Sequence, residues 1–158
     1  MKYESVQQAI DALDKHQQTL AAYNHAIGVV YLDASTAAPK GTWEGRGRTM
    51  ATLSEITYNL ETSPEVGEML TYLEAHMEEL TELQKRQVEV LRKSYDQTNK
   101  VPAQEYIEYS VLQNDAQAAW EKAKNENDYE AFAPYLEKIV AFNRKFAGYY
   151  NPEMPPYR

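Results

Sequence analysis

The feature that most constrains the fold is a run of apolar positions, alternately three and four residues apart, near the N-terminus. Its members, called the seam below, are Val6, Ala9, Leu13, His16, Leu20, Tyr23, Ile27 and Val30. This spacing places them on one face of a single long helix. The flanking positions are rich in Gln and Ala rather than charged. Two packings remain open, an antiparallel hairpin within the chain and a coiled coil with a second copy, and the uncharged flanks favour the hairpin.

The rest of the sequence also predicts helices, separated by short breaks at proline, glycine and capping residues. The second begins by Thr42 to Glu44, a third follows Ser63-Pro64, and a fourth runs from about Glu78 to Asn99. A fifth runs from about Ala103 to Asn125, and the last follows a cap at Asp128 and continues to about Gly148. No segment alternates with the period of a strand. We therefore expect an all-α fold, with about six helices in an antiparallel bundle-like array, a long N-terminal helix and no sheet.

Length and composition limit the organisation and the partners. A chain of 158 residues suits one domain, which we place at 1–150, followed by a proline-rich extended tail at 151–158. The net charge of −8 argues against a nucleic-acid partner, because phosphate binding needs clustered Lys and Arg. No apolar run has the length of a membrane helix, so no membrane partner is expected. The polar N-terminus lacks the apolar centre of a signal peptide, and a cytoplasmic location is the expectation.

A zinc peptidase site on a helix needs two His one turn apart with a Glu between them, the HExxH pattern. The three histidines are His16, His25 and His76, and none has a second His at that spacing. There is no cysteine, so a thiolate site is excluded. Glu74, Glu78, Glu79 and Glu82 are typical of a solvated helix face. We expect no catalytic residue, no metal ligand and no cofactor in this chain.

Glycines Gly41, Gly45 and Gly47 surround Arg46, in a pattern that superficially resembles a phosphate-binding loop. Neither GxxxxGK[ST] nor GxGxxG is present, and no strand precedes the segment. A loop and helix start with unusual backbone angles explain these glycines better.

Several short segments, in the same order along the chain, resemble one peptidase family. The segment from Asp33 to Leu53 supplies Asp33, Thr36, Pro39, Lys40, Gly41, Glu44, Arg46, Gly47, Ala51 and Leu53. Further matches are Thr62 to Gly67, Tyr95-Asp96 with Lys100-Val101-Pro102, Gln117 to Trp120 with Ala123, and Phe132 to Val140. The chain resembles the N-terminal helical part of the thermostable-type (Taq-type) HExxH zinc metallocarboxypeptidases over nearly its whole length.

The resemblance implies a cleft wall or lid in an enzyme that removes C-terminal amino acids from peptides. The zinc of the full-length family, the peptide substrate and the rest of the catalytic domain would then lie outside this chain. It also implies roles near the cleft for Asp33, Thr36 and Arg46, and a homo-oligomeric or domain interface on the faces that carry Val111, Trp120, Phe142 and Phe146. Leu32-Asp33-Ala34-Ser35 departs from the family's Trp-Asp-Gln-Glu, and Ala38 replaces its Met. These changes would weaken polar contacts in the cleft.

Two questions stay open at this point. The chain is either a truncation of a metallocarboxypeptidase that is inactive alone, or a standalone non-catalytic helical interaction module related to it. Arg46 either pairs with Asp33 or a substrate carboxylate, or it holds the loop in place as a structural pin. We expect the segment from Asp33 to Arg48 to be the most mobile and the most function-related part of the chain.

Overall fold

The computed structural model describes residues 3–39 and 41–155, and the side chains of Trp43 and Glu44 are not described. The described residues form six α-helices and one short 3-10 helix and contain no strand, as the sequence predicts. The helices are α1 (Val6–Thr36), α2 (Trp43–Thr62), α3 (Pro64–Glu74), α4 (Glu82–Thr98), α5 (Ala103–Glu126) and α6 (Tyr129–Tyr150), with η1 (Met77–Glu79) between α3 and α4. No described helix combines the length and apolar character needed to cross a membrane.

Internal contacts divide the chain into two compact units, described here one at a time. Unit 1 comprises Met1–Ala26 and Ile56–Asn99, and unit 2 comprises Ile27–Glu55 and Lys100–Arg158. Helices α1 and α2 each contribute to both. The expectation of one domain over 1–150 stays a prediction, and the part of the expected tail at 156–158 lies outside the described residues.

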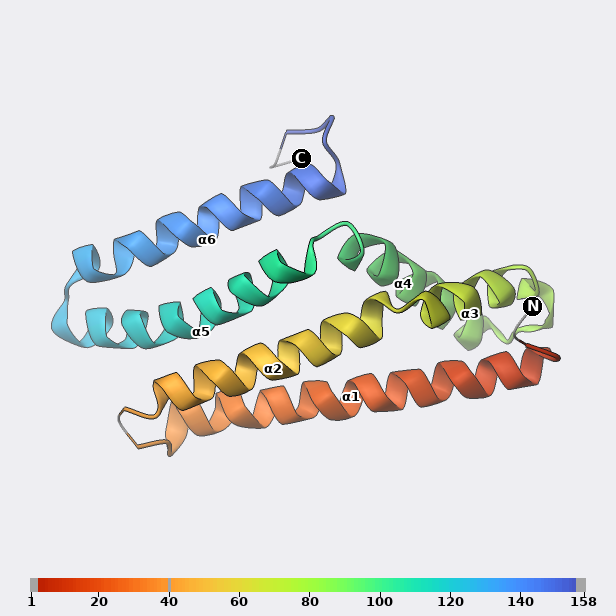
Figure 1. Cartoon of the computed structure of the whole chain (residues 1–158), viewed down its shortest axis with the longest axis horizontal. Helices are drawn as coiled ribbons and strands as arrows, with labels where there is room; N and C mark the ends of the chain where they lie inside the picture. Colours follow the sequence, from red (N-terminus) through yellow and green to blue (C-terminus); the bar gives the residue numbers. More distant parts are fainter. Residues whose placement is uncertain (1–2, 40, 156–158) are drawn as a thin grey trace. The chain divides into compact units, whose positions relative to one another are not determined.

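Unit 1 is built on an apolar core between the first turns of α1 and the hairpin of α3 and α4 (Figure 1). The core residues are Ala9, Ile10, Leu13, Val66, Met69, Leu70, Leu73, Leu80 and Val88. Complete burial of one Leu or Val side chain contributes about 1.5–3 kcal/mol to folding. The first turns of the seam therefore pack within their own chain, which agrees with the intramolecular packing that its flanks favour.

Side-chain caps fix where α3 and α4 begin. Ser63 accepts a hydrogen bond from the amide of Val66 at 3.3 Å, and Pro64 occupies the first turn, as the sequence predicts. Helix α4 begins at Glu82, and the expected start near Glu78 is wrong. Thr81 and Gln84 form a capping box there, with the backbone amide of Gln84 donating to the Thr81 hydroxyl and the backbone amide of Thr81 donating to the side-chain oxygen of Gln84. The preceding turn is the 3-10 helix.

In unit 2, α5 and α6 form an antiparallel hairpin (Figure 1). The connection is short because Asn127 adopts a left-handed conformation, with φ 54°, and Asp128 caps α6 by accepting from the Ala131 amide. An aromatic cluster joins the helices, with Tyr109 on α5 packed edge-on against Phe146 on α6 at a 5.2 Å ring separation. Helix α6 extends to Tyr150, beyond the Gly148 that the sequence predicts as its end.

Candidate functional site

The segment that joins α1 to α2 is the candidate site with the most sequence support, and it lies in unit 2. The carbonyl of Asp33 accepts hydrogen bonds from the amides of both Ala37 and Ala38, which ends α1. Gly41 has a φ of 94°, a conformation that side-chain-bearing residues rarely adopt. The Arg46 amide then donates to the Thr42 carbonyl at 3.1 Å as α2 starts. Helix occupies most of Asp33 to Arg48, so the expected loop is shorter than predicted. Lys40, part of the family match, lies outside the described residues.

Arg46 is held against α5 by one side-chain contact. Its Nε donates a 2.7 Å hydrogen bond to Oδ1 of Asn114, which is 1% exposed. The Asn114 amide group in turn donates to Asp115 at 3.2 Å. Gly47 is buried beside this contact, and a Cβ there would lie at an ordinary contact distance, 3.4 Å, from Nδ2 of Asn114. A second polar contact between the same helices joins the hydroxyls of Ser54 and Ser110 at 2.6 Å.

A cavity of about 530 Å³ opens beside Arg46. One wall is the α1–α2 connection, including Ala38, and the other is the last turns of α5. Its charged lining has both signs, because Arg46 and Lys122 face the cavity together with Glu121 and Glu126. Within its own side chain, Arg46 uses only Nε as a hydrogen-bond donor to another described residue, Asn114. Its terminal guanidinium nitrogens are therefore available to a ligand. The arrangement suits a carboxylate that approaches Arg46.

The other two cleft candidates are placed differently. Asp33 and Thr36 are exposed in the last turn of α1 and do not line the cavity. The Thr36 hydroxyl donates to the Leu32 carbonyl one turn earlier, at 2.6 Å, so it acts within the helix. Among the described residues the partner of Arg46 is Asn114 rather than Asp33. Sequence reasoning missed Asn114, because it stands in the polar stretch Gln113-Asn114-Asp115 and nothing local marks it as the buried member.

The four interface candidates lie in unit 2 with different exposure. Trp120 is 40% exposed, and the ammonium group of Lys124 lies 4.8 Å from its ring centre. Val111 and Phe142 are half-buried. Phe146 is 7% exposed and sits inside the aromatic cluster, so it supports the hairpin from within. Trp120 is therefore the candidate best placed to contact another surface, and the interface itself stays a prediction.

The described residues do not fit a zinc ion. No group of three His, Cys, Asp or Glu side chains among them comes close enough to hold a metal. His16 and His25 belong to α1, and His76 hydrogen-bonds through Nδ1 to the Tyr72 carbonyl at 2.8 Å. A peptidase metal would need ligands from outside the described part of the chain.

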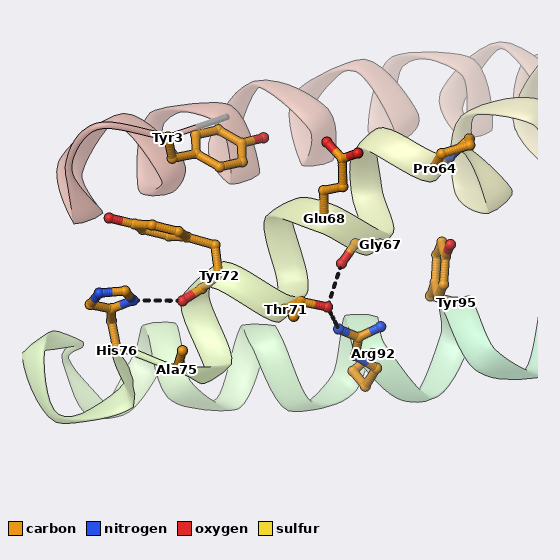
Figure 2. Close-up of a pocket in the computed structure, with 10 residues that line it drawn as sticks. All are labelled: Tyr3, Pro64, Gly67, Glu68, Thr71, Tyr72, Ala75, His76, Arg92 and Tyr95. Carbon is orange, nitrogen blue, oxygen red and sulfur yellow. Dashed lines mark hydrogen bonds between the residues drawn. The ribbon is translucent and has the colours of Figure 1, made fainter. Parts of the chain in front are cut away.

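A second hollow, of about 830 Å³, lies on α3 in unit 1. Its rings and charges come from Tyr3 before α1, Glu68 and Tyr72 on α3, His76 just after α3, and Arg92 and Tyr95 on α4 (Figure 2). Sequence reasoning did not identify this hollow, because its residues are far apart in the chain.

Comparison with known proteins places the whole arrangement in one family. The family model described as Carboxypeptidase Taq (M32) metallopeptidase matches residues 12–158. Carboxypeptidase 1 of Bacillus subtilis (strain 168) is 35% identical over 138 residues, which are 87% of this chain and 28% of that protein. Thermostable carboxypeptidase 1 of Thermus thermophilus is 29% identical over 148 residues, 89% of this chain and 29% of that protein.

Solved structures of carboxypeptidases are also similar to this chain. A crystal structure described as BsuCP superposes with a TM-score of 0.91 at 32% identity, over 95% of this chain and 30% of the other. The M32 carboxypeptidase from Deinococcus radiodurans R1 gives a TM-score of 0.69 at 28% identity, over 93% of this chain and 29% of the other. The chain thus spans less than a third of the length of these relatives. With the family model covering nearly the whole sequence, this chain belongs to the Carboxypeptidase Taq (M32) metallopeptidase family.

Proposed function

We propose that this chain forms an N-terminal wall of the substrate cleft in a zinc-dependent carboxypeptidase that removes C-terminal amino acids from peptides. Family membership is the observation that carries the proposal. In such an enzyme the bound zinc would activate water and polarise the scissile carbonyl. The residues of this chain would contribute shape and charge to the cleft, and the metal ligands would come from the rest of the catalytic domain.

Arg46 is the residue through which this wall would meet substrate. A carboxypeptidase must recognise a free C-terminal carboxylate, and Arg pairs with carboxylates through two parallel hydrogen bonds. The Nε contact to Asn114 would set the direction of the guanidinium, and its terminal nitrogens would reach into the 530 Å³ cavity. Nε of Arg46 would then hold the segment in place, and the terminal nitrogens of the same side chain would bind the substrate carboxylate.

Complementation with a relative tests the proposal. This chain alone should retain no stoichiometric zinc after dialysis and should not cleave a blocked dipeptide that ends in a free carboxylate. Mixed with Bacillus subtilis carboxypeptidase 1 from which the matched region has been removed, it should restore hydrolysis. Arg46→Ala in the mixture should raise KM at least roughly tenfold, while Asn59→Ala, on the exposed side of α2, should leave KM unchanged. Zinc-dependent hydrolysis by the chain alone would contradict the proposal.

A second candidate is a non-catalytic interaction module. Its support is that unit 2 holds most of the exposed large hydrophobic side chains of the described residues, among them Leu32 at 64% and Tyr129 at 62% exposure. Such surfaces commonly mark contacts with another protein. Stable self-association of the chain without any restoration of hydrolysis in the mixture would favour this reading.

A further inference from the structure

The hollow on α3, called the tyrosine pocket below, owes its depth to small side chains. Its lining includes Gly67, Thr71 and Ala75, which are four residues apart and therefore share one face of the helix, and the Tyr95 ring lies over Gly67. Val66 and Leu70, on another face of the same helix, are buried in the core of unit 1. Helix α3 therefore packs on the core through one face, and the tyrosine pocket lies along another face. All residues that line this pocket belong to unit 1.

Aromatic rings form the walls. The Tyr3 and Tyr72 rings lie 5.5 Å apart between centres, at an angle of 49°. The His76 ring stacks on the other side of Tyr72 at 4.4 Å, so Tyr72 lies between two rings and Tyr3 is the ring that a ligand would meet at this end (Figure 2). Tyr95 stands at the opposite end of the pocket, with the carboxylate of Glu68 between it and Tyr3 (Figure 2). A ligand in the pocket would meet ring surface at both ends.

The charges around the tyrosine pocket favour a positive ligand. Arg92 is already neutralised, because its Nε and one terminal nitrogen each donate a 2.8 Å hydrogen bond to the carboxylate of Glu74. The same terminal nitrogen also donates to Thr71, at 3.0 Å. Among the described residues, Glu68 has neither a hydrogen bond nor an ion pair. Burial raises the pKa of Tyr3. The nearby carboxylates of Glu68 and Glu65 raise that pKa further, because they make the local electrostatic potential negative.

We propose that the tyrosine pocket binds an organic cation, an alkylammonium or guanidinium group, against the ring of Tyr3 and the carboxylate of Glu68. Aromatic ring faces attract such cations, and quaternary ammonium ligands are typical occupants of aromatic cages. One cation–π contact already exists at the edge of the pocket, where the Arg92 guanidinium lies 5.6 Å from the centre of the Tyr95 ring. The inference rests on the geometry of unit 1 and does not depend on the proposed peptidase role.

The direct test compares a cation with its neutral isostere. Choline and 3,3-dimethylbutan-1-ol have nearly the same shape, but only choline is charged. Each is titrated into the full chain, at constant ionic strength, while the amide resonances of Gly67 and Thr71 in the pocket and of Gly148 in unit 2 are followed by NMR. We expect choline to shift the two pocket amides only, with an affinity roughly tenfold above that of the alcohol.

Matched variants assign the interaction to its groups. Tyr3→Leu and Glu68→Gln should each weaken choline binding about fivefold, through loss of the ring and of the charge. Tyr129→Leu, at an exposed tyrosine of unit 2, and Glu55→Gln, at an exposed carboxylate of α2, should leave the affinity unchanged. Circular dichroism confirms that each variant keeps its helices. Because Glu68 is exposed, Glu68→Gln keeps the test decisive even if Tyr3→Leu unfolds unit 1.

Two further arms identify the source of the cation. A blocked peptide with a central arginine and its citrulline counterpart are titrated in the same way. Stronger binding of the arginine peptide than of choline would assign the pocket to basic peptides, and the reverse to free ammonium compounds; both outcomes support the proposal. Equal binding of choline and the alcohol, or an unchanged affinity in Glu68→Gln, would overturn it. Dimer formation abolished by Ala75→Leu would also overturn it, because a second helix would then be the occupant.

Discussion

Arg46 on α2 donates a 2.7 Å hydrogen bond from Nε to the amide oxygen of Asn114 on α5, across 68 positions of sequence. Asn114 is among the most completely buried side chains of the described chain, so this contact cannot be replaced by water without opening the helix pair. A buried donor or acceptor that loses its partner costs its full desolvation free energy. Removal of either residue should therefore cost more than the hydrogen bond itself contributes.

We expect Asn114→Ala to lower the free energy of unfolding by about 2 kcal/mol, since it leaves the guanidinium without its acceptor and opens a small cavity. The measurement is urea denaturation followed by circular dichroism. Asn59→Ala, at an exposed position of α2, should change stability by less than about 0.5 kcal/mol. Equal losses of unfolding free energy in the two variants would contradict the structural role of Asn114.

Gly67 and Gly28 should respond in opposite ways to alanine. Both lie inside helices, where Ala is normally preferred by about 1 kcal/mol. A Cβ at Gly28 would meet nothing within 4 Å, so Gly28→Ala should stabilise the chain by about that amount. A Cβ at Gly67 would lie 2.5 Å from the Tyr95 hydroxyl oxygen and 2.9 Å from Cζ, so Gly67→Ala should destabilise by about 1 kcal/mol or more.

The second substitution Tyr95→Leu checks the cause of that loss. In the Gly67→Ala background it removes the clashing ring, and the double variant should be less destabilised than the sum of the two single changes. Strict additivity would show that Tyr95 is not the group that excludes a side chain at Gly67.

His16 should make the chain sensitive to mild acid. Its Nε2 is buried without a hydrogen-bond partner among the described residues, and burial lowers its pKa below the ordinary value of 6.5. Below that value the unfolded chain binds a proton that the folded chain does not, so stability falls as the pH decreases through the unfolded pKa. We expect His16→Phe to flatten this slope between about pH 6.5 and 5 in urea denaturation. His25→Phe, at an exposed position of the same helix, should not flatten it.

Glu61 should make the free energy of unfolding decrease as the pH rises, which is opposite to the effect of His16. Burial raises its pKa above 4.5, although a hydrogen bond with Thr98 partly offsets the increase. The folded chain then holds a proton that the unfolded chain has lost, so this contribution to stability is present below pH 4.5 and disappears as the pH rises through the folded pKa. Glu61→Gln should therefore be more stable than the natural sequence at about pH 7 and no more stable at about pH 4. Glu55→Gln is the exposed control on α2.

The exposed apolar surface of unit 2 should drive association. We expect analytical ultracentrifugation to find dimers or larger species at high micromolar concentration, and Trp120→Gln to shift the population toward monomer. Leu83→Gln, at a 71% exposed position of unit 1, is the matched control and should not change the population. A natural sequence that stays monomeric throughout would show that this surface does not pair with itself.

The sequence predicts the helices because each is specified locally. The seam predicts α1, Ser63-Pro64 predicts the start of α3, and Asp128 predicts the start of α6. The expected start of α4 is too early, although the T-x-x-Q spacing of Thr81 and Gln84 carries the capping signal.

The sites are less predictable, because their contacts join distant segments. No local sequence pattern predicts that Arg46 contacts Asn114, or that the Tyr3 ring contacts the Tyr72 ring. The sequence resemblance identifies the family and directs attention to Arg46, but the family pattern gives no partner for its Nε. Such partners depend on which helices pack together, a property of the tertiary structure that helix periodicity alone leaves open.

The contrast between the apolar core of unit 1 and the polar pairs of α2 and α5 has a consequence for temperature. Burial of Leu13, Leu70 and Leu73 weakens on cooling, because hydration of apolar surface becomes less unfavourable. The Arg46–Asn114 and Ser54–Ser110 contacts have little of that heat-capacity dependence. Near about 0 °C the core around α3 should therefore loosen before α2 separates from α5, so that cold and heat would open this chain at different places.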